Sequence, residues 1–255
     1  MRKFWQPFYT VYVVITFLVS IVLAFPFFLT SGLINNAASR KFIYNLVHYW
    51  SKGWLFITGM PLRVSGSFPK NGKYIIIANH ISYLDTVNIY GALPEYFRTL
   101  ARKEMVHIPV FGMIYRQLTI LVDRSSSDSR TKSMRLMYRQ LKNECHIAIF
   151  PEGSFNETGE TLKSFYDGAF RLAVTTQTPL LPMIFPDTEQ RWHYSAWWKF
   201  SPGRNRSVFL EPITITGKNI DMLKQEAFTA METALKDNKL AQDEKEKNKL
   251  NLFIH

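Results

Sequence analysis

Cysteine is the scarcest residue in this 255-residue sequence: Cys145 stands alone, so no disulfide can form within the chain. No Cys/His pair has the spacing of a structural zinc site. The sequence also lacks a G-x-S-x-G nucleophile elbow, a G-x-x-x-x-G-K-S/T phosphate loop and a G-x-G-x-x-G dinucleotide motif. Serine hydrolases, P-loop nucleotide-binding proteins and dinucleotide-dependent enzymes are therefore not indicated.

Acidic residues are few relative to basic ones, with 20 Asp and Glu against 31 Lys and Arg, a net charge of +11. This balance favours a polyanionic partner. Nucleic acid is not expected, because no basic stretch with interleaved aromatic residues and no known nucleic-acid module is present. Ten basic and three acidic residues lie between Arg98 and Lys142. This segment is either a solvated cationic face or a dock for an acidic protein, a ligand with phosphate groups or anionic lipid headgroups.

A run of 22 residues without charge extends from Phe8 to Leu29. As a helix it would be about 33 Å long, enough to cross a bilayer core of about 30 Å. Arg2 and Lys3 precede the run, which favours a cytoplasmic N-terminus. Residues 8–29 either span the bilayer or lie in it, and a cleaved signal peptide is the remaining alternative.

A second helix is predicted over residues 41–57. Lys41, Asn45, His48 and Lys52 would line its polar face, opposite apolar and aromatic side chains. This pattern is typical of a helix lying in a membrane interface and of an amphipathic helix packed on its own domain. Further along the chain, the aromatic segment 191–200 could likewise dip into the interface or cap the core.

From residue 74, short β-branched runs alternate with amphipathic stretches. The expected strands are 74–78, 98–101, 119–122, 147–150, 180–185 and 207–210, and the expected helices are 83–91, 110–116, 129–143, 164–175 and 221–236. The alternation predicts an α/β fold with a mostly parallel or mixed central sheet flanked by helices, preceded by an N-terminal two-helix membrane motif. We expect membrane-anchoring or interfacial helices over 1–58, the α/β domain over 59–235 and a charged C-terminal tail over 236–255.

The stretch 74–85 is the most informative one. A buried strand would deliver His80 to its C-terminal end, and Asp85 follows in the next helix. The C-terminal ends of strands in open α/β sheets are where ligand sites form, and a His oriented by an Asp can act as a general base. Polar blocks follow three other predicted strands in the same way: Arg102-Lys103, Asp123-Arg124 and Pro151-Glu152-Gly153-Ser154.

Four blocks of the sequence resemble those of the glycerolipid acyltransferases. Asn79-His80-Ile81-Ser82-Tyr83-Leu84-Asp85 resembles their N-H-x-x-x-x-D motif, and Phe150-Pro151-Glu152-Gly153-Ser154 their F-P-E-G-T/S motif. Lys103 to Gly112 and Leu181-Pro182-Met183 are similar to two further blocks. The resemblance covers roughly Gly59 to Pro212, with the order and spacing of the bacterial 1-acylglycerol-3-phosphate acyltransferases, which carry an N-terminal membrane motif.

The resemblance implies transfer of an acyl chain from an acyl thioester to the sn-2 hydroxyl of 1-acylglycerol-3-phosphate (lysophosphatidate), giving phosphatidate. Acyl-CoA or acyl-acyl carrier protein would be the co-substrate, with no cofactor and no metal. His80 would be the general base, oriented by Asp85. The implied substrate-binding residues are Asn79, Ser82, Lys103, Arg124, Glu152, Gly153 and Ser154. Membrane lipids would be partners, at a bacterial inner membrane with the catalytic domain on the cytoplasmic side.

One position departs from the family pattern. The family often has Arg after E-G-T, whereas this chain has Phe155. Lys103 and Arg124 therefore become the stronger candidates for binding the acceptor phosphate, with Arg102, Lys163 and Arg171 behind them. The departure keeps two alternatives open: an acyltransferase for another lysolipid, of the ornithine-lipid or lipid A type, or a catalytically inactive membrane lipid-binding protein.

Overall fold

A seven-stranded β-sheet forms the centre of the computed structural model, which describes residues 2–34, 36–107, 111–123, 126–196 and 198–252. The strands are β1 (Leu62–Ser65), β2 (Ile75–Ala78), β3 (Phe97–Arg102), β4 (Thr119–Val122), β5 (His146–Ile149), β6 (Leu180–Ile184) and β7 (Asn205–Phe209). The helices are α1 (Arg2–Ile34), α2 (Ala37–Ile57), α3 (Leu84–Ala92), α4 (Phe111–Leu118), α5 (Ser127–Asn143), α6 (Gly168–Thr176), α7 (Thr188–Arg191) and α8 (Ile220–Leu252), with a 3-10 turn η1 (Lys103–His107).

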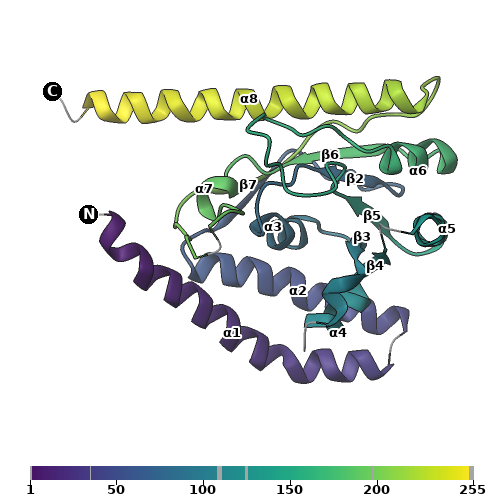
Figure 1. Cartoon of the computed structure of the whole chain (residues 1–255), viewed down its shortest axis with the longest axis horizontal. Helices are drawn as coiled ribbons and strands as arrows, with labels where there is room; N and C mark the ends of the chain where they lie inside the picture. The colour runs from purple at the N-terminus through teal and green to yellow at the C-terminus, as the bar shows by residue number, and fades with distance from the viewer. Residues whose placement is uncertain (1, 35, 108–110, 124–125, 197, 253–255) are drawn as a thin grey trace.

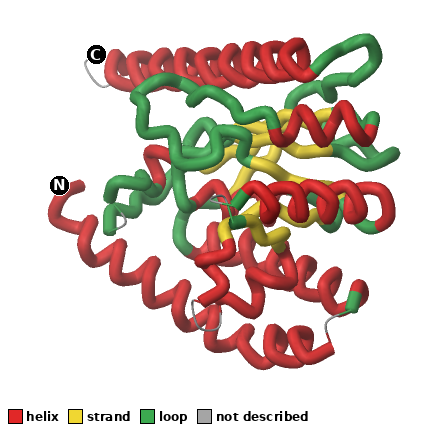
Figure 2. Tube along the Cα trace, turned by 45° about the vertical axis from the view of Figure 1, so that its right-hand side comes forward, coloured by secondary structure: helices red, strands yellow, loops and turns green. Residues whose placement is uncertain are grey.

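The predicted α/β fold class is confirmed, with helices on both faces of a mixed sheet (Figures 1 and 2). Three short elements were not predicted, β1, η1 and α7. β1 is an edge strand of four mostly exposed residues, so it carries no apolar pattern that a sequence reading could detect. Helix α8 continues well past residue 236, through the part expected to be a charged tail.

The strand order is β1-β7-β6-β2-β5-β3-β4, with β7 antiparallel to β6 and every other pair parallel. β2 therefore lies in the middle of the sheet, between β5 and β6. Its register pairs Ile77 with Ile149 of β5 and Ala78 with Met183 of β6. Because these strands are parallel, the segments that follow all three emerge side by side at one edge of the sheet.

Alternate residues of β2 enter two separate cores. Ile75 and Ile77 pack with side chains of α5, α6 and α8, whereas Ile76 and Ala78 pack with side chains of α2, α3 and α4. All four residues of β2 are fully buried. This explains why the strand is an uninterrupted apolar run instead of an alternating one, since helices cover both of its faces.

Helix α2 packs on the α/β domain, one of the two arrangements that its pattern allowed. Ile43, Tyr44 and Val47 join the core against α3. The prediction that His48 lies on the polar face was wrong. This residue is at the border of the buried face, and its Nδ1 donates to the carbonyl oxygen of Tyr90 at 2.8 Å, which compensates the imidazole for its burial.

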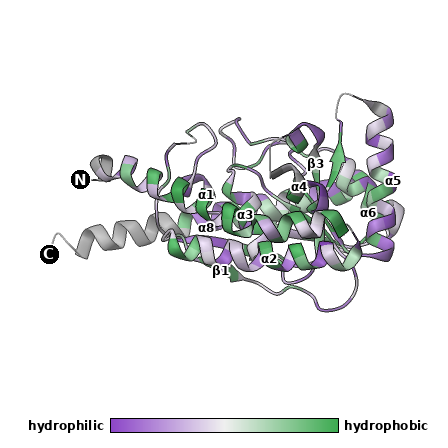
Figure 3. Cartoon of the chain, turned by 90° about the horizontal axis from the view of Figure 1, so that it is seen from below, coloured by the Kyte–Doolittle hydropathy of each residue, from purple (hydrophilic) through white to green (hydrophobic). Residues whose placement is uncertain are grey.

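Helix α1 runs antiparallel to α2 on the outside of the molecule (Figure 1). Phe17 packs edge-on against Trp50 and Trp54, with ring centroids 5.7 and 5.5 Å apart. The other side of α1 is an exposed apolar stripe with three- and four-residue spacing, made by Phe8, Val11, Ile15, Leu18, Val22, Leu29 and Leu33. Hydrophobic residues along α1 are green in Figure 3. Within the described residues, Trp5–Ile34 is the one helical stretch long and apolar enough to cross a membrane.

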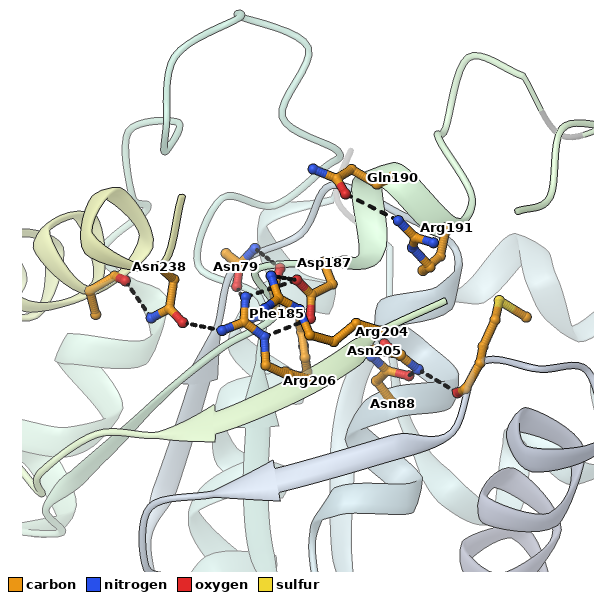
Figure 4. Close-up of polar contacts among 12 residues, drawn as sticks. Asn79, Asn88, Phe185, Asp187, Gln190, Arg191, Arg204, Asn205, Arg206 and Asn238 are labelled. Atoms are coloured by element: carbon orange, nitrogen blue, oxygen red, sulfur yellow. Dashed lines mark hydrogen bonds and ion pairs between the residues drawn. The ribbon is translucent and has the colours of Figure 1, made fainter. Parts of the chain in front are cut away.

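A buried ion pair ties α8 to the segment that follows β6. Both carboxylate oxygens of Asp187 accept hydrogen bonds from Arg206, at 2.7 and 2.8 Å, and Arg204 lies 3.4 Å away (Figure 4). Arg206 also donates to the side-chain oxygen of Asn238 in α8 at 2.6 Å. The side chain of Asp187 is only 2% exposed, so this contact is protected from solvent screening.

We predict that Asp187→Ala lowers the free energy of unfolding by about 2 kcal/mol, because it leaves Arg206 without its carboxylate in a largely buried position. The melting temperature should fall by about 4–8 °C, measured by thermal unfolding in detergent. Glu226→Ala, which removes the partly exposed Lys218–Glu226 pair, is the control and should change stability by less than about 1 kcal/mol. Equal shifts for the two variants would contradict this assignment.

Candidate active site

His80 and Asp85 meet at the C-terminal end of β2. Asp85 lies in the first turn of α3, and its side chain is completely buried. Its Oδ2 atom is 3.0 Å from Nδ1 of His80 and also accepts the backbone N–H groups of Ile81 and Ser82, at 2.7 and 2.8 Å. The β2–α3 turn therefore closes around this carboxylate, which fixes the imidazole relative to the helix.

The contact with Asp85 determines where the imidazole of His80 carries its proton. An ionised carboxylate can only accept hydrogen bonds, so Nδ1 of His80 is the donor and Nε2 keeps a free lone pair. The side chain of His80 is 18% exposed, whereas that of Asp85 is not exposed at all. This arrangement can take a proton at Nε2 while the charge that forms on the ring is stabilised by the carboxylate.

Glu152 joins this turn to the segment after β5. Its Oε1 atom accepts the backbone N–H of His80 at 2.7 Å, and its Oε2 atom accepts the backbone N–H of Lys163 at 2.9 Å. The backbone N–H of Asn156 completes the link by donating to the carbonyl of His80 at 2.8 Å. Burial is the main cause that raises the pKa of Glu152 to about 7, opposed by its two backbone hydrogen bonds.

Asn79 and Ser82 are buried and bonded within the chain. The side-chain oxygen of Asn79 accepts the backbone N–H of Phe185 at 2.8 Å, which joins the ends of β2 and β6 (Figure 4). The hydroxyl of Ser82 donates to the carbonyl of Trp192 and accepts the backbone N–H of Leu84 at 3.1 Å. Both side chains therefore hold neighbouring segments in place around His80.

Two aromatic rings contact the imidazole of His80, and further rings pack on these two. Phe150 stacks on His80 with ring centroids 4.2 Å apart, and Phe155 packs against it at 4.4 Å. Tyr83 contacts both Phe155 and Trp192, at 4.7 and 5.0 Å. Tyr194 stacks on Phe155 at 5.9 Å. We call this set the aromatic wall: Tyr83, Phe150, Phe155, Trp192 and Tyr194.

The predicted phosphate-binding cations, Lys103 and Arg124, do not share the surroundings of His80. Lys103, two strand positions from β2 in the sheet, forms an ion pair with Asp123, and the hydrogen bond and charge of this partner raise the pKa of Lys103. Arg124 lies outside the described residues. Ser154 follows Gly153, which has a left-handed φ of 73°, and its hydroxyl contacts the Nζ atom of Lys163 at 2.7 Å.

Two parts of this site were not predicted as parts of it. Trp192 and Tyr194 come from the aromatic segment 191–200, whose density was visible in the sequence but whose position was not. Thr10 of α1 also reaches this segment, donating to the carbonyl of Trp198 at 2.7 Å. Among the described residues, no group of three or more His, Cys, Asp or Glu side chains could hold a metal ion.

Comparison with known proteins shows that this chain is similar to acyltransferases. Residues 61–186 match the family model described as Acyltransferase. The chain is 30% identical over 179 residues to a 1-acyl-sn-glycerol-3-phosphate acyltransferase of Cocos nucifera, which covers 69% of this chain and 54% of the relative. It is 27% identical over 170 residues to the alpha enzyme of that name from Mus musculus, covering 65% of this chain and 59% of the relative.

A solved structure is similar over nearly the whole chain. The 1-acyl-sn-glycerophosphate acyltransferase of Thermotoga maritima superimposes with a TM-score of 0.78 at 25% identity, covering 94% of this chain and 98% of that one. The chain spans a little over half the length of the curated relatives that it matches. The matched segment 61–186 lies inside the stretch expected from the four motifs, and the predicted family is confirmed. The chain carries an Acyltransferase domain over residues 61–186 and is similar over most of its length to proteins named 1-acyl-sn-glycerol-3-phosphate acyltransferase.

Proposed function

We propose that this protein transfers an acyl chain from a thioester to the sn-2 hydroxyl of 1-acylglycerol-3-phosphate, giving phosphatidate. The observation that carries the proposal is the contact between Nδ1 of His80 and Oδ2 of Asp85, at 3.0 Å. It supplies the group that an alcohol needs as a nucleophile, a base that removes the proton during attack. The names of the relatives support the choice of acceptor.

In the proposed reaction, the hydroxyl oxygen of the acceptor attacks the thioester carbonyl while Nε2 of His80 takes the hydroxyl proton. A carbon–oxygen bond forms, the carbon–sulfur bond breaks, and the leaving thiolate takes the proton back from the imidazolium. Asp85 holds the imidazole in the required tautomer and stabilises its transient charge. No covalent intermediate with the protein is needed, in agreement with the missing nucleophile elbow.

The aromatic wall suits the donor in this reaction. Two of its rings pack directly on the His80 imidazole, which is 18% exposed, and the set offers an apolar surface to an acyl chain. Excluding water favours attack by the lipid hydroxyl over hydrolysis of the thioester. The donor itself, acyl-CoA or acyl-acyl carrier protein, carries phosphate groups, and the exposed cations of α5 offer it a complementary surface (Figure 3).

The residues that bind the substrate differ from the residues that position His80. Buried and bonded within the chain, Asn79, Ser82 and Glu152 position His80 and its loops. Gly153 and Ser154 are partly buried in the loop after β5 and are our candidates for contacting the acceptor. Lys103 and Arg124 remain our candidates for steering the phosphate of the acceptor toward this edge of the sheet.

We infer that α1 lies along one leaflet of a membrane instead of crossing it. The helix is about 50 Å long and is held to the rest of the chain near both ends, by Thr10 to the carbonyl of Trp198 and by Ser31 to Gln117 of α4, each at 2.7 Å. If α1 crossed the bilayer while keeping both contacts, the α/β domain would have to lie in the bilayer core. The exposed apolar stripe would face lipid, with the domain on the cytoplasmic side of a bacterial inner membrane.

The proposed proton transfer predicts the effect of two substitutions. His80→Ala should lower kcat with lysophosphatidate and acyl-CoA by about 10²–10⁴-fold, and Asp85→Asn should give a smaller loss, because the shape of the turn is kept without the charge. Phosphatidate formation by purified protein measures both, and sedimentation with lipid vesicles should be unchanged. Near-normal turnover by His80→Ala would refute the base, and a wild-type protein inactive on lysophosphatidate but active on another lysolipid would refute the acceptor.

The second prediction concerns Glu152. Its pKa of about 7 in the folded protein exceeds the ordinary glutamate value of 4.5, so between these values the folded state binds the extra proton. This contribution to stability is full below about pH 4.5 and is lost as the pH rises to about 7. Glu152→Gln has no such titration, and its amide N–H₂ must face one of two backbone N–H groups. It should be less stable by about 1–3 kcal/mol, with the gap to wild type growing as the pH falls from about 7 to 5. A gap independent of pH in urea unfolding would contradict the raised pKa.

The third prediction concerns the N-terminal helices. Single cysteines at Lys3, Lys41 and, as a domain marker, Lys142 should all react with a membrane-impermeant maleimide in inverted vesicles, and none should react in intact cells. The native Cys145 is buried and gives little background. If α1 crosses the bilayer, the cysteines at positions 3 and 41 will react from opposite sides.

A further inference from the structure

An acceptor with a phosphate headgroup brings two negative charges close to His80, and the site needs a cation to receive them. The position where relatives often carry Arg holds Phe155, whose ring packs on the imidazole at 4.4 Å. Lys103 is already paired with Asp123 and starts two strands away from β2. A cation on a loop that contacts His80 directly would be better placed to receive this phosphate.

Lys163 meets this requirement. Its backbone N–H is held by the same Glu152 carboxylate that holds the backbone N–H of His80, so the two residues are anchored to one side chain. Its Nζ atom reaches back to the hydroxyl of Ser154 at 2.7 Å, next to Phe155. Lys163 is partly buried, and no carboxylate of a described residue lies within ion-pair distance of its ammonium group.

The backbone beside Lys163 adds donors of the same kind. Gly153 adopts a left-handed conformation, which turns the chain so that successive N–H groups point to one side. The N–H of Asn156 is taken by the carbonyl of His80, whereas the N–H groups of Ser154 and Phe155 have no acceptor among the described residues. The loop after β5 thus carries an ammonium group, a hydroxyl and two backbone donors, beside Phe150 and Phe155 of the aromatic wall.

We propose that Lys163, with Ser154, binds the phosphate of the acceptor and replaces the guanidinium that Phe155 displaces. The ligand class is a phosphomonoester on a lysolipid. The same chemistry occurs in coenzyme A, so the acceptor and the donor must be tested separately. The proposal rests on the acyl transfer proposed above and adds the residue that decides headgroup preference.

The test uses full-length Lys163→Met, which keeps the length of the side chain and removes its charge. The KM for lysophosphatidate should rise by about 10- to 100-fold, with little change in kcat, whereas kcat/KM for monoacylglycerol, which lacks the phosphate, should stay at the wild-type value. The KM for acyl-CoA at saturating lysophosphatidate should also be unchanged. Lys163→Arg should restore most of the affinity for lysophosphatidate, because it returns the charge.

Lys73→Met is the matched control. Lys73 is also partly buried and hydrogen-bonded, to the carbonyl of Glu144 at 3.4 Å, but it precedes β2 and lies at the opposite edge of the sheet from His80. The Lys73→Met substitution removes the same charge and should leave the KM for lysophosphatidate unchanged. Thermal unfolding of all variants confirms that they are folded.

Three results would overturn the proposal: an unchanged KM for lysophosphatidate in Lys163→Met, an equal loss with monoacylglycerol, or a rise in the KM for acyl-CoA alone. In each of these cases wild-type protein still forms phosphatidate in a His80-dependent way, so the proposed function survives. A wild-type protein that does not acylate lysophosphatidate at all refutes the proposed function itself.

Discussion

The buried carboxylate of Glu152 is the contact on which the geometry of the site depends. One side chain accepts the backbone N–H of His80 and that of Lys163, at 2.7 and 2.9 Å, and so joins two loops that leave different strands of the sheet. Burying a carboxylate is unfavourable unless hydrogen bonds compensate it. Two backbone donors provide that compensation here, and the raised pKa of Glu152 shows that it is incomplete. This buried side chain holds the backbone of His80 at the end of β2.

Polar and apolar groups have different roles around His80. On the protein side, Asp85, Asn79 and Ser82 bind backbone groups and fix the turns at the ends of β2 and β6. The aromatic wall packs on the imidazole through Phe150 and Phe155 and gives it an apolar surrounding. A base with a fixed tautomer in an apolar setting fits the transfer of an acyl chain between two lipid-soluble partners.

The N-terminal helices are joined to the α/β domain and to the site by direct contacts. α2 contributes Tyr44 and Val47 to the core, while α1 packs on α2 and bonds to the aromatic segment through Thr10. That segment in turn accepts the hydroxyl of Ser82, three residues before Asp85. A chain of direct contacts therefore connects the surface that would meet lipid to the turn that carries His80 and Asp85. It explains why the exposed apolar stripe lies on the same body as the site.

The sequence by itself determined the fold class, the family and the pair His80 and Asp85, because β-branched runs, turn residues and short motifs are local signals. It also marked Phe155 as unusual. What only the tertiary structure decided are contacts between residues far apart in the chain: His48 with Tyr90, Trp192 with the turn after β2, and Lys163 with Ser154 and Glu152. Such contacts depend on strand order and register, which bring β2, β5 and β6 side by side and which no short stretch of sequence encodes.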